Sequence, residues 1–172
     1  MFFKRRDKQE ALGEERPPPG GKGGGADPTH VLRDELGLCQ LWFLELRLHE
    51  ELARAARVNS VFSLACWQLK LLPGEAPSQN LLQQAAGLIA GSLRSYDIVA
   101  RLDDERFVAI LLDAPYEAAS TVAFRIKGDL QVRVSSAGRW QAGIAAFPRD
   151  AVDGDGLIQA AFRRLGEDAR AA

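Results

Sequence analysis

Apolar and polar residues follow one another along this chain with periods that predict regular structure from about residue 38 to residue 169. Apolar residues three or four apart predict four helices, over residues 38–57, 77–95, 115–130 and 155–169. Shorter segments that are almost continuously apolar or alternate predict four strands, over residues 60–72, 96–102, 106–112 and 139–147. The resulting order, helix–strand–helix–strand–strand–helix–strand–helix, predicts an α+β fold in which helices cover one mixed sheet with a central hairpin.

Residues 1–30 have a different composition from the rest. They contain the run ERPPPGGKGGGADP, whose Pro, Gly and charged residues bury too little apolar surface to offset the entropy of ordering. We therefore expect a disordered tail over residues 1–30 and one domain over residues 31–172. The FFKRR tip has the charges of a signal peptide but no apolar segment after it. We interpret it as a solubilising end, with a weak partner or membrane contact as the alternative.

Composition narrows the classes of function. The net charge of −1 does not favour binding to nucleic acid or to an anionic membrane, and no apolar run reaches the length of a membrane span. Cys39 and Cys66 are far apart and belong to no CxxC pair, while His30 and His49 have no neighbouring ligand pattern. We expect reduced thiols, no metal site, no cofactor and a cytoplasmic protein.

The hairpin between residues 96–102 and 106–112 poses a chemical question. Its turn reads LDDERF, so that Asp103 and Asp104 stand where a two-residue turn usually has glycine. The charges in this turn either carry out chemistry or occupy a place where chemistry has been lost.

Several stretches, taken in order, resemble the GGDEF domain, the fold of the diguanylate cyclases. The resemblance covers about Arg33 to Ala169 and implies a single nucleotidyl-cyclase-like domain. It is carried by LGLCQLWFLELRLHEELARAARVNSVFSL, LLQQAAGLIAGSLRSYDIVARL, the hairpin turn, and WQAGIAAFPRDA with Ala142 at the family's serine. No single stretch is specific, but several in register together indicate the family.

The hairpin turn departs from the family's Arg-x-Gly-Gly-(Asp/Glu)-Glu-Phe signature. Asp103 and Asp104 replace the glycines that let the backbone approach the triphosphate of GTP. Glu105 matches the first acid, which binds metal in the family. Arg106 replaces the second acid, and Phe107 is retained. The resemblance thus implies a degenerate signature turn, and the residues themselves favour a solvated turn over a site.

Other parts of the family's catalytic machinery are also missing. The family's first strand ends in Asp-x-Asp, which holds Mg²⁺ against nucleophile and phosphates, whereas this chain has Gln68 and Lys70 there. The loop that follows is shorter than in the family, and the last helix has Arg163 and Arg164 but no lysine for phosphate. We expect no catalytic residue, no metal and no enzymatic activity.

A second family site is retained. Active members often carry an inhibitory product site, Arg-x-x-Asp, which begins nine residues before the first turn glycine, and a second arginine on the helix after the hairpin. Arg94 and Asp97 match the first part and Arg125 matches the second. Arginine binds guanine or phosphate through a planar fork, and Asp97 can accept from guanine N–H groups. The resemblance implies cyclic di-GMP as ligand of Arg94, Asp97 and Arg125.

Simpler interpretations of these residues stay open. Arg-x-x-Asp is a common pattern that recurs here at Arg101 and Asp104. Arg94 and Asp97 can form an ordinary ion pair at a helix end, and Arg125 can be a solvated helix residue. All three are expected to be exposed.

The leading hypothesis is a catalytically inactive GGDEF protein that acts as a cyclic di-GMP receptor in signalling. The alternative is a pseudo-enzyme that binds a protein partner or a second copy of itself, without nucleotide. An active cyclase is the least favoured hypothesis. We expect Trp67 and Trp140 to pack inside the domain, and Trp42 to face solvent or a partner.

Overall fold

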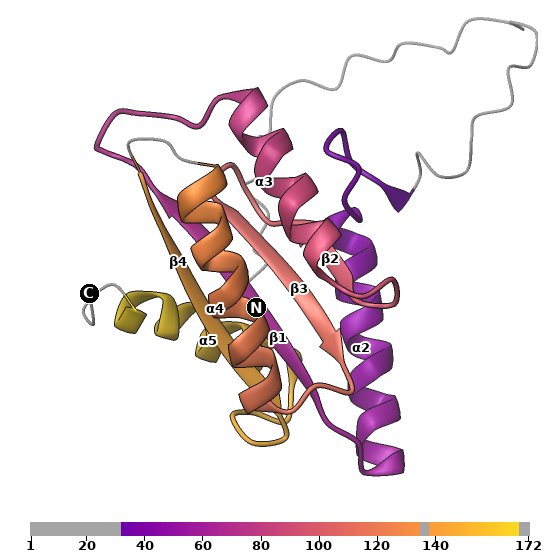
Figure 1. Cartoon of the computed structure of the whole chain (residues 1–172). Coiled ribbons are helices and arrows are strands. Elements are labelled where there is room, and N and C mark those ends of the chain that lie inside the picture. Colours follow the sequence, from indigo (N-terminus) through magenta and orange to yellow (C-terminus); the bar gives the residue numbers. More distant parts are fainter. Residues whose placement is uncertain (1–31, 135–137, 169–172) are drawn as a thin grey trace, which may run out of the picture.

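The structure is a computed structural model that describes residues 32–134 and 138–168 (Figure 1). All eight predicted elements are confirmed in type and order. They are α2 (Leu41–Val58), β1 (Phe62–Lys70), α3 (Gln79–Ser92), β2 (Ile98–Arg101), β3 (Arg106–Leu112), α4 (Tyr116–Arg133), β4 (Arg139–Phe147) and α5 (Gly154–Asp168). The expected tail over residues 1–30 lies outside the described residues. No helix in the described part of the chain is long and apolar enough to cross a membrane.

The strands form a four-stranded sheet in the order β2-β3-β1-β4. All three pairings are antiparallel, so the prediction of a mixed sheet was wrong. Helical crossovers usually join neighbouring parallel strands. Here α3 joins β1 to β2 with β3 between them, and α4 joins β3 to β4 with β1 between them. This split arrangement keeps every pair of neighbours antiparallel. Within the described residues, an isolated bridge between Cys39 and Ala100 is the parallel pairing.

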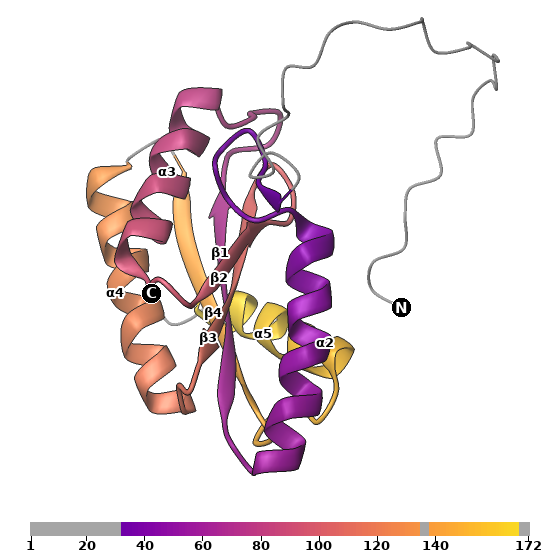
Figure 2. The ribbon, with the colours of Figure 1, turned by 90° about the vertical axis from the view of Figure 1, so that its right-hand side faces the viewer.

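Helices cover both faces of the sheet (Figure 2): α3 and α4 lie on one side, and α2 and α5 on the other. Successive side chains of a strand point to opposite faces, so each strand contributes to two cores. In β1, Ala65, Trp67 and Leu69 pack toward α3 and α4, whereas Leu64 and Cys66 pack toward α2 and α5. This explains why the segment is almost continuously apolar rather than alternating.

Two local features determine where α3 begins and how closely α5 packs on the sheet. The Ser78 hydroxyl accepts the Leu81 N–H at 3.2 Å, and Ser78 is therefore the N-cap of α3. Helix α5 packs so closely on β4 that a Cβ at Gly143 would lie 2.1 Å from the carbonyl oxygen of Ala161. Only glycine fits at this contact.

Helix α2 buries a charged residue that the periodic pattern did not indicate. Glu51 is 4% exposed, whereas the neighbouring Leu52 is only half-buried. The guanidinium Nε of Arg54 donates to Glu51 at 2.8 Å, and its Nη2 lies 3.4 Å from Asp113. Arg54 therefore compensates the buried carboxylate, as burial of a charge requires.

Side chains cover the outer edge of β4, which is an edge strand of the sheet. The Arg164 guanidinium donates to the carbonyl oxygen of Ile144 at 2.6 Å, and the Asp150 carboxylate accepts the Ala146 N–H at 2.8 Å. Arg164 and Asp150 are joined by two hydrogen bonds of 2.8 and 2.9 Å. These contacts occupy backbone groups that an exposed edge would offer to another chain.

The Asp150–Arg164 pair should make stability depend on pH. Hydrogen bonds from Arg164 hold the pKa of Asp150 below its ordinary value of 3.8. A lowered folded pKa stabilises the protein above the ordinary pKa, and this stabilisation is lost as pH falls below it. Asp150→Asn should lower the free energy of unfolding by about 1–3 kcal/mol at pH 7, and the difference should become smaller as pH falls from the ordinary pKa of the carboxyl group toward its lowered pKa in the folded protein.

Urea denaturation between pH 3 and pH 7 measures this difference. Glu117→Gln is the matched control, because Glu117 pairs with Arg149 at 3.1 Å but its side chain is 81% exposed. That variant should change stability by less than about 1 kcal/mol. A pH-independent effect of Asp150→Asn would contradict the prediction.

Two buried tryptophans differ in the hydrogen bonding of the indole N–H. Trp67 and Trp140 are 0% and 1% exposed, which confirms the expected packing. The Trp67 indole N–H donates to the Ala123 carbonyl oxygen at 3.0 Å, whereas the Trp140 indole N–H has no hydrogen-bond partner among the described residues. Burial of Trp140 therefore leaves its N–H donor without a hydrogen bond, which lowers the stability of the folded protein.

Replacing each tryptophan with phenylalanine should separate the hydrogen bond from the loss of volume. Both changes remove the same atoms, but only Trp67→Phe removes a hydrogen bond. Trp67→Phe should therefore reduce the free energy of unfolding by about 1 kcal/mol more than Trp140→Phe does. Chemical denaturation of both variants checks this, and an equal or larger cost for Trp140→Phe would contradict it.

Candidate functional site

The segment that connects α3 to β2 contains a tight turn of four residues, 94–97, which carries two of the predicted site residues. The Asp97 N–H donates to the Arg94 carbonyl oxygen at 3.0 Å, and the Asp97 carboxylate accepts the Arg94 N–H at 2.9 Å. The other oxygen of Asp97 accepts the Leu112 N–H at 3.2 Å. Asp97 is half-buried rather than exposed as expected, because both carboxylate oxygens hold backbone amides.

The guanidinium of Arg94 does not pair with the Asp97 carboxylate. Its Nη1 donates to the hydroxyl oxygen of Tyr96 at 2.9 Å, and its carbon lies 5.7 Å from the centre of the Tyr96 ring. Arg94 forms no ion pair with any acidic residue in the described part of the chain. The simple ion pair between Arg94 and Asp97 is therefore not formed.

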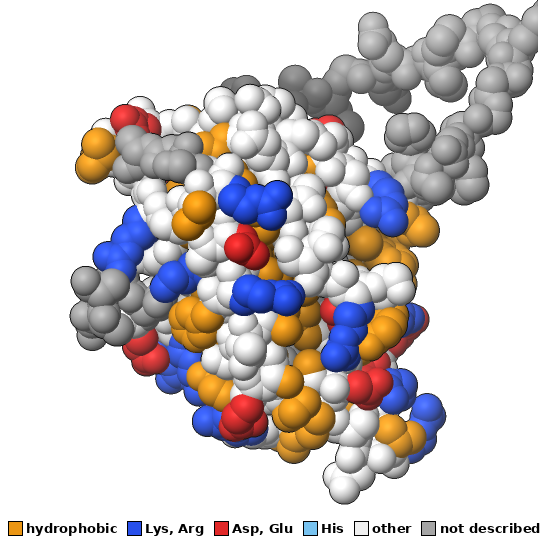
Figure 3. Space-filling view, viewed as in Figure 1, with side chains coloured by type: hydrophobic (Ala, Val, Ile, Leu, Met, Phe, Trp, Pro, Cys, Tyr) orange, Lys and Arg blue, Asp and Glu red, His pale blue; other side chains and the backbone are white. Residues whose placement is uncertain are grey.

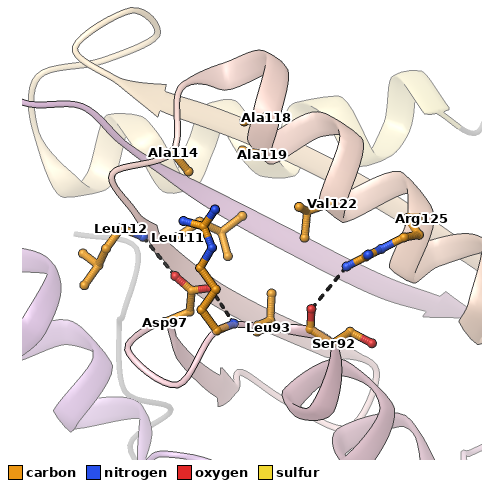
Figure 4. Close-up of a pocket in the computed structure, with 11 residues that line it drawn as sticks. Ser92, Leu93, Asp97, Leu111, Leu112, Ala114, Ala118, Ala119, Val122 and Arg125 are labelled. Carbon is orange, nitrogen blue, oxygen red and sulfur yellow. Dashed lines mark hydrogen bonds between the residues drawn. The ribbon is translucent and has the colours of Figure 1, made fainter.

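Arg125 reaches from α4 toward the end of α3 (Figure 4). Its Nη2 donates to the carbonyl oxygen of Ser92 at 3.3 Å. Ser92 is the last residue of α3, where carbonyl groups have no partner within the helix. The contact uses one of the five donors of the guanidinium. Arg125 is exposed, as predicted.

Arg94, Asp97 and Arg125 all line one cavity of about 270 Å³. Its walls are the end of α3, the turn before β2, the end of β3 and the first half of α4, and its surface is largely apolar. The apolar lining comes from Leu93, Leu111, Leu112, Ala114, Ala118, Ala119 and Val122. The structure thus brings together all three predicted ligand-binding residues at an open, apolar hollow.

The face over α3 and α4 carries several Lys and Arg side chains (Figure 3). Within residues 32–134 and 138–168, the hydrogen bonds of the Arg94 and Arg125 guanidinium groups go to oxygens without net charge, the Tyr96 hydroxyl and the Ser92 carbonyl. Asp97 is the acidic residue in the lining. The arrangement offers two guanidinium groups and an apolar floor, which suits an anionic ligand with a flat ring.

The hairpin turn between β2 and β3 is longer than the predicted two-residue turn. Residues 102–105 join the strands, and the Leu102 N–H donates to the Arg106 carbonyl oxygen at 2.8 Å. Asp103 accepts the Glu105 N–H at 3.0 Å and the Arg106 Nε at 2.7 Å. Neither aspartate has a positive φ. A turn of this length, closed by an aspartate side chain, therefore has no need for glycine.

The residues of the hairpin turn differ in exposure. Asp103 and Asp104 are exposed, as a solvated turn requires, while Glu105 and Arg106 are half-buried. The Arg106 guanidinium lies 5.0 Å from the ring centre of Phe162 in α5, and Phe107 is fully buried in the core.

At the position where the resemblance would place a metal, one carboxylate lies near an amide. The Gln68 Nε2 lies 3.4 Å from the Glu105 carboxylate, and Lys70 at the end of β1 is exposed. Mg²⁺ prefers carboxylate, phosphate and water oxygens in octahedral geometry. Within residues 32–134 and 138–168, no three His, Cys, Asp or Glu side chains are grouped to hold a metal ion. This donor set does not fit Mg²⁺.

The cysteines are free thiols, as expected from the sequence. Cys66 is fully buried in β1, and burial raises its pKa to about 12. Burial also raises the pKa of the half-buried Cys39. Both thiols are therefore protonated at neutral pH and poorly nucleophilic.

Comparison with known families identifies the class of protein. The family model described as "Diguanylate cyclase, GGDEF domain" matches residues 38–170, and the chain belongs to this family. The predicted GGDEF resemblance and the single nucleotidyl-cyclase-like domain are confirmed. No curated protein matches the chain.

Solved GGDEF domains share the fold. The GGDEF domain of TpbB (YfiN) from Pseudomonas aeruginosa is 25% identical, with a TM-score of 0.70, over 81% of this chain and 90% of the other. The FimX GGDEF domain from the same organism is 19% identical, with a TM-score of 0.71, over 82% and 95% of the two chains. The DgcB GGDEF domain from Caulobacter crescentus, solved in complex with c-di-GMP, is 16% identical, with a TM-score of 0.70, over 83% and 92%.

Sequence reasoning missed Tyr96, the Ser92 carbonyl and the apolar floor. Tyr96 occupies an unspecified position of the Arg-x-x-Asp motif, two residues after Arg94, so the sequence did place it close to that arginine. The floor combines residues of β3 with residues of α4, which come together only once the helix packs on the sheet.

Proposed function

We propose that this GGDEF domain is catalytically inactive and acts as a receptor for cyclic di-GMP. The observation that supports the proposal most strongly is that Arg94 and Arg125 meet at one apolar cavity, and neither forms an ion pair with an acidic residue in the described part of the chain. The ligand carries two phosphodiester charges, and each guanidinium retains donors for a phosphate or for the O6 and N7 of guanine.

The size of the cavity limits how the ligand binds. About 270 Å³ is at the lower end of the usual range for small-molecule sites, roughly 300–1,000 Å³. One guanine, with its adjoining phosphate, enters the hollow, and the rest of the cyclic dinucleotide lies over the face of α3 and α4. The c-di-GMP complex of the DgcB GGDEF domain makes this ligand the natural first choice.

Asp97 has two roles in this proposal. Its carboxylate shapes the turn through the N–H groups of Arg94 and Leu112. Each carboxylate oxygen keeps a second lone pair, which can accept from the guanine N1–H or N2–H. The residue therefore positions Arg94 as well as binding ligand.

Inactivity is proposed from the groups at the family's catalytic positions. Asp103 and Asp104 stand at the positions of the family's glycines, Arg106 at that of the second acid and Gln68 at that of a metal-binding acid. Two added carboxylates repel a triphosphate, and an amide is a weak ligand for Mg²⁺.

Purified protein incubated with GTP and Mg²⁺ should yield no cyclic di-GMP and no linear intermediate, because metal and phosphate contacts are lacking. Mass spectrometry of the reaction mixture measures this, with an active diguanylate cyclase as positive control. Product formed by protein that is free of contaminating cyclase would contradict the proposed inactivity.

Cyclic di-GMP should bind the wild-type protein and raise its melting temperature by mass action. Arg94→Ala should weaken binding about 10- to 100-fold, because it removes a charge-assisted bidentate contact. Arg125→Ala should weaken it less, and Asp97→Asn should weaken it while also lowering the stability of the free protein. Isothermal titration calorimetry and thermal unfolding measure the two effects.

Arg133→Ala is the matched control for this series. Arg133 is an exposed arginine in the last turn of α4, outside the cavity lining. Arg133→Ala removes the same charge as Arg125→Ala, but it should leave the affinity for cyclic di-GMP unchanged. Absence of binding by the wild-type protein at high micromolar cyclic di-GMP would reject the receptor function.

A protein-interaction module is the second candidate function, and one observation favours it. Trp42 and Leu46 lie one turn apart on α2 and are 49% and 47% exposed. Large apolar side chains in such a pair often mark a contact with another protein. Trp42 faces solvent, as the sequence predicted.

A further inference from the structure

The orientation of Arg94 depends on a residue that the family motif leaves unspecified. Tyr96 is the residue before Asp97 and is 51% exposed. It does not line the cavity, but Arg94 does. The two side chains stand on the same four-residue turn, which the backbone hydrogen bonds between Arg94 and Asp97 hold in one shape.

Tyr96 contacts the Arg94 guanidinium in two ways. Its hydroxyl oxygen accepts from Nη1 at 2.9 Å, and its ring centre lies 5.7 Å from the guanidinium carbon, within the range of a cation–π contact. Both contacts restrain a side chain that otherwise has several rotamers. Neither contact neutralises the positive charge.

Other arginines near the sheet ends have acidic partners. Arg101 pairs with Glu35 at 2.5 Å, Arg106 with Asp103 at 2.7 Å and Arg164 with Asp150 at 2.8 Å. In those pairs a carboxylate occupies the donors that an anionic ligand would need. The neutral phenol of Tyr96 takes one donor of Arg94 and leaves the remaining donors and the full charge for a ligand.

We propose that Tyr96 is the positioning residue of the ligand site: it holds the Arg94 guanidinium in place, without cancelling its charge, so that the fork is ready for the guanine or phosphate of an anionic nucleotide. This inference rests on the proposed function for its ligand. Fixing a long side chain before binding removes part of the entropic cost of ordering it in the complex.

A comparison of three variants tests the role of Tyr96 in binding. Tyr96→Phe removes the hydroxyl and keeps the ring, and it should weaken cyclic di-GMP binding about three- to tenfold. Tyr96→Leu removes both contacts and should weaken it further. Tyr116→Phe is the matched control, since Tyr116 is the other tyrosine of the chain and lies under Arg149 and not at Arg94. It should not change binding.

A double-mutant cycle with Arg94→Lys shows whether Tyr96 acts through Arg94. Lysine keeps the charge but lacks the planar fork that the phenol orients. In the Arg94→Lys background, Tyr96→Phe should cost less than twofold. An undiminished loss in that background would mean that Tyr96 contacts the ligand directly, and it would overturn the inference. So would unchanged binding by Tyr96→Phe and Tyr96→Leu.

A measurement on the free protein separates this inference from the proposed function. The side-chain NMR signals of Arg94 should report a restrained guanidinium in the wild-type protein and faster rotation in Tyr96→Phe, with equal melting temperatures. Unchanged Arg94 signals would overturn the role of Tyr96 whether or not the ligand binds. If the wild-type protein binds no cyclic di-GMP but the Arg94 signals respond to Tyr96→Phe, the receptor function fails and the positioning role stands.

Discussion

The rest of the structure depends on one constraint: the central strand β1 buries side chains on both of its faces. Trp67 and Leu69 must be shielded from water on one face of the sheet, and Leu64 and Cys66 on the other face. Because both faces are apolar, helices must pack on each, and α3 and α4 come to lie on the same face (Figures 1 and 2). The candidate site lies where α3 ends beside α4. Its position thus follows from the packing of the sheet.

The geometry of the site results from satisfying backbone groups at that junction. The chain leaves α3, turns and enters β2 within a few residues, and Asp97 binds the amides of Arg94 and Leu112 in doing so. Arg125 meets a free carbonyl at the end of α3. The contacts that stabilise the turn also place both guanidinium groups at the cavity. The residues that form these structural contacts are therefore the same ones to which we assign the proposed binding role.

The sequence predicted the elements well because their periodicity is strong, but it did not predict their pairing. The hairpin of β2 and β3 was evident, whereas the insertion of β3 between β1 and β2 depends on tertiary packing, and the sheet was therefore expected to be mixed. At the site, the resemblance to the family's Arg-x-x-Asp site implied that Arg94, Asp97 and Arg125 lie together, and the structure places them at one cavity. The resemblance did not show that Asp97 binds amides or that Arg94 turns to Tyr96, because side-chain partners depend on distances that a linear pattern does not contain.

The central claim is that the cavity between the end of α3, the turn before β2 and α4 binds cyclic di-GMP. Backbone amide NMR spectra recorded during titration with this ligand test the claim most directly, since they locate binding residue by residue. The account predicts chemical-shift changes centred on residues 92–97, 111–114 and 118–125, with little change at residues 101–106. Changes centred on residues 101–106, or none at all, would contradict it.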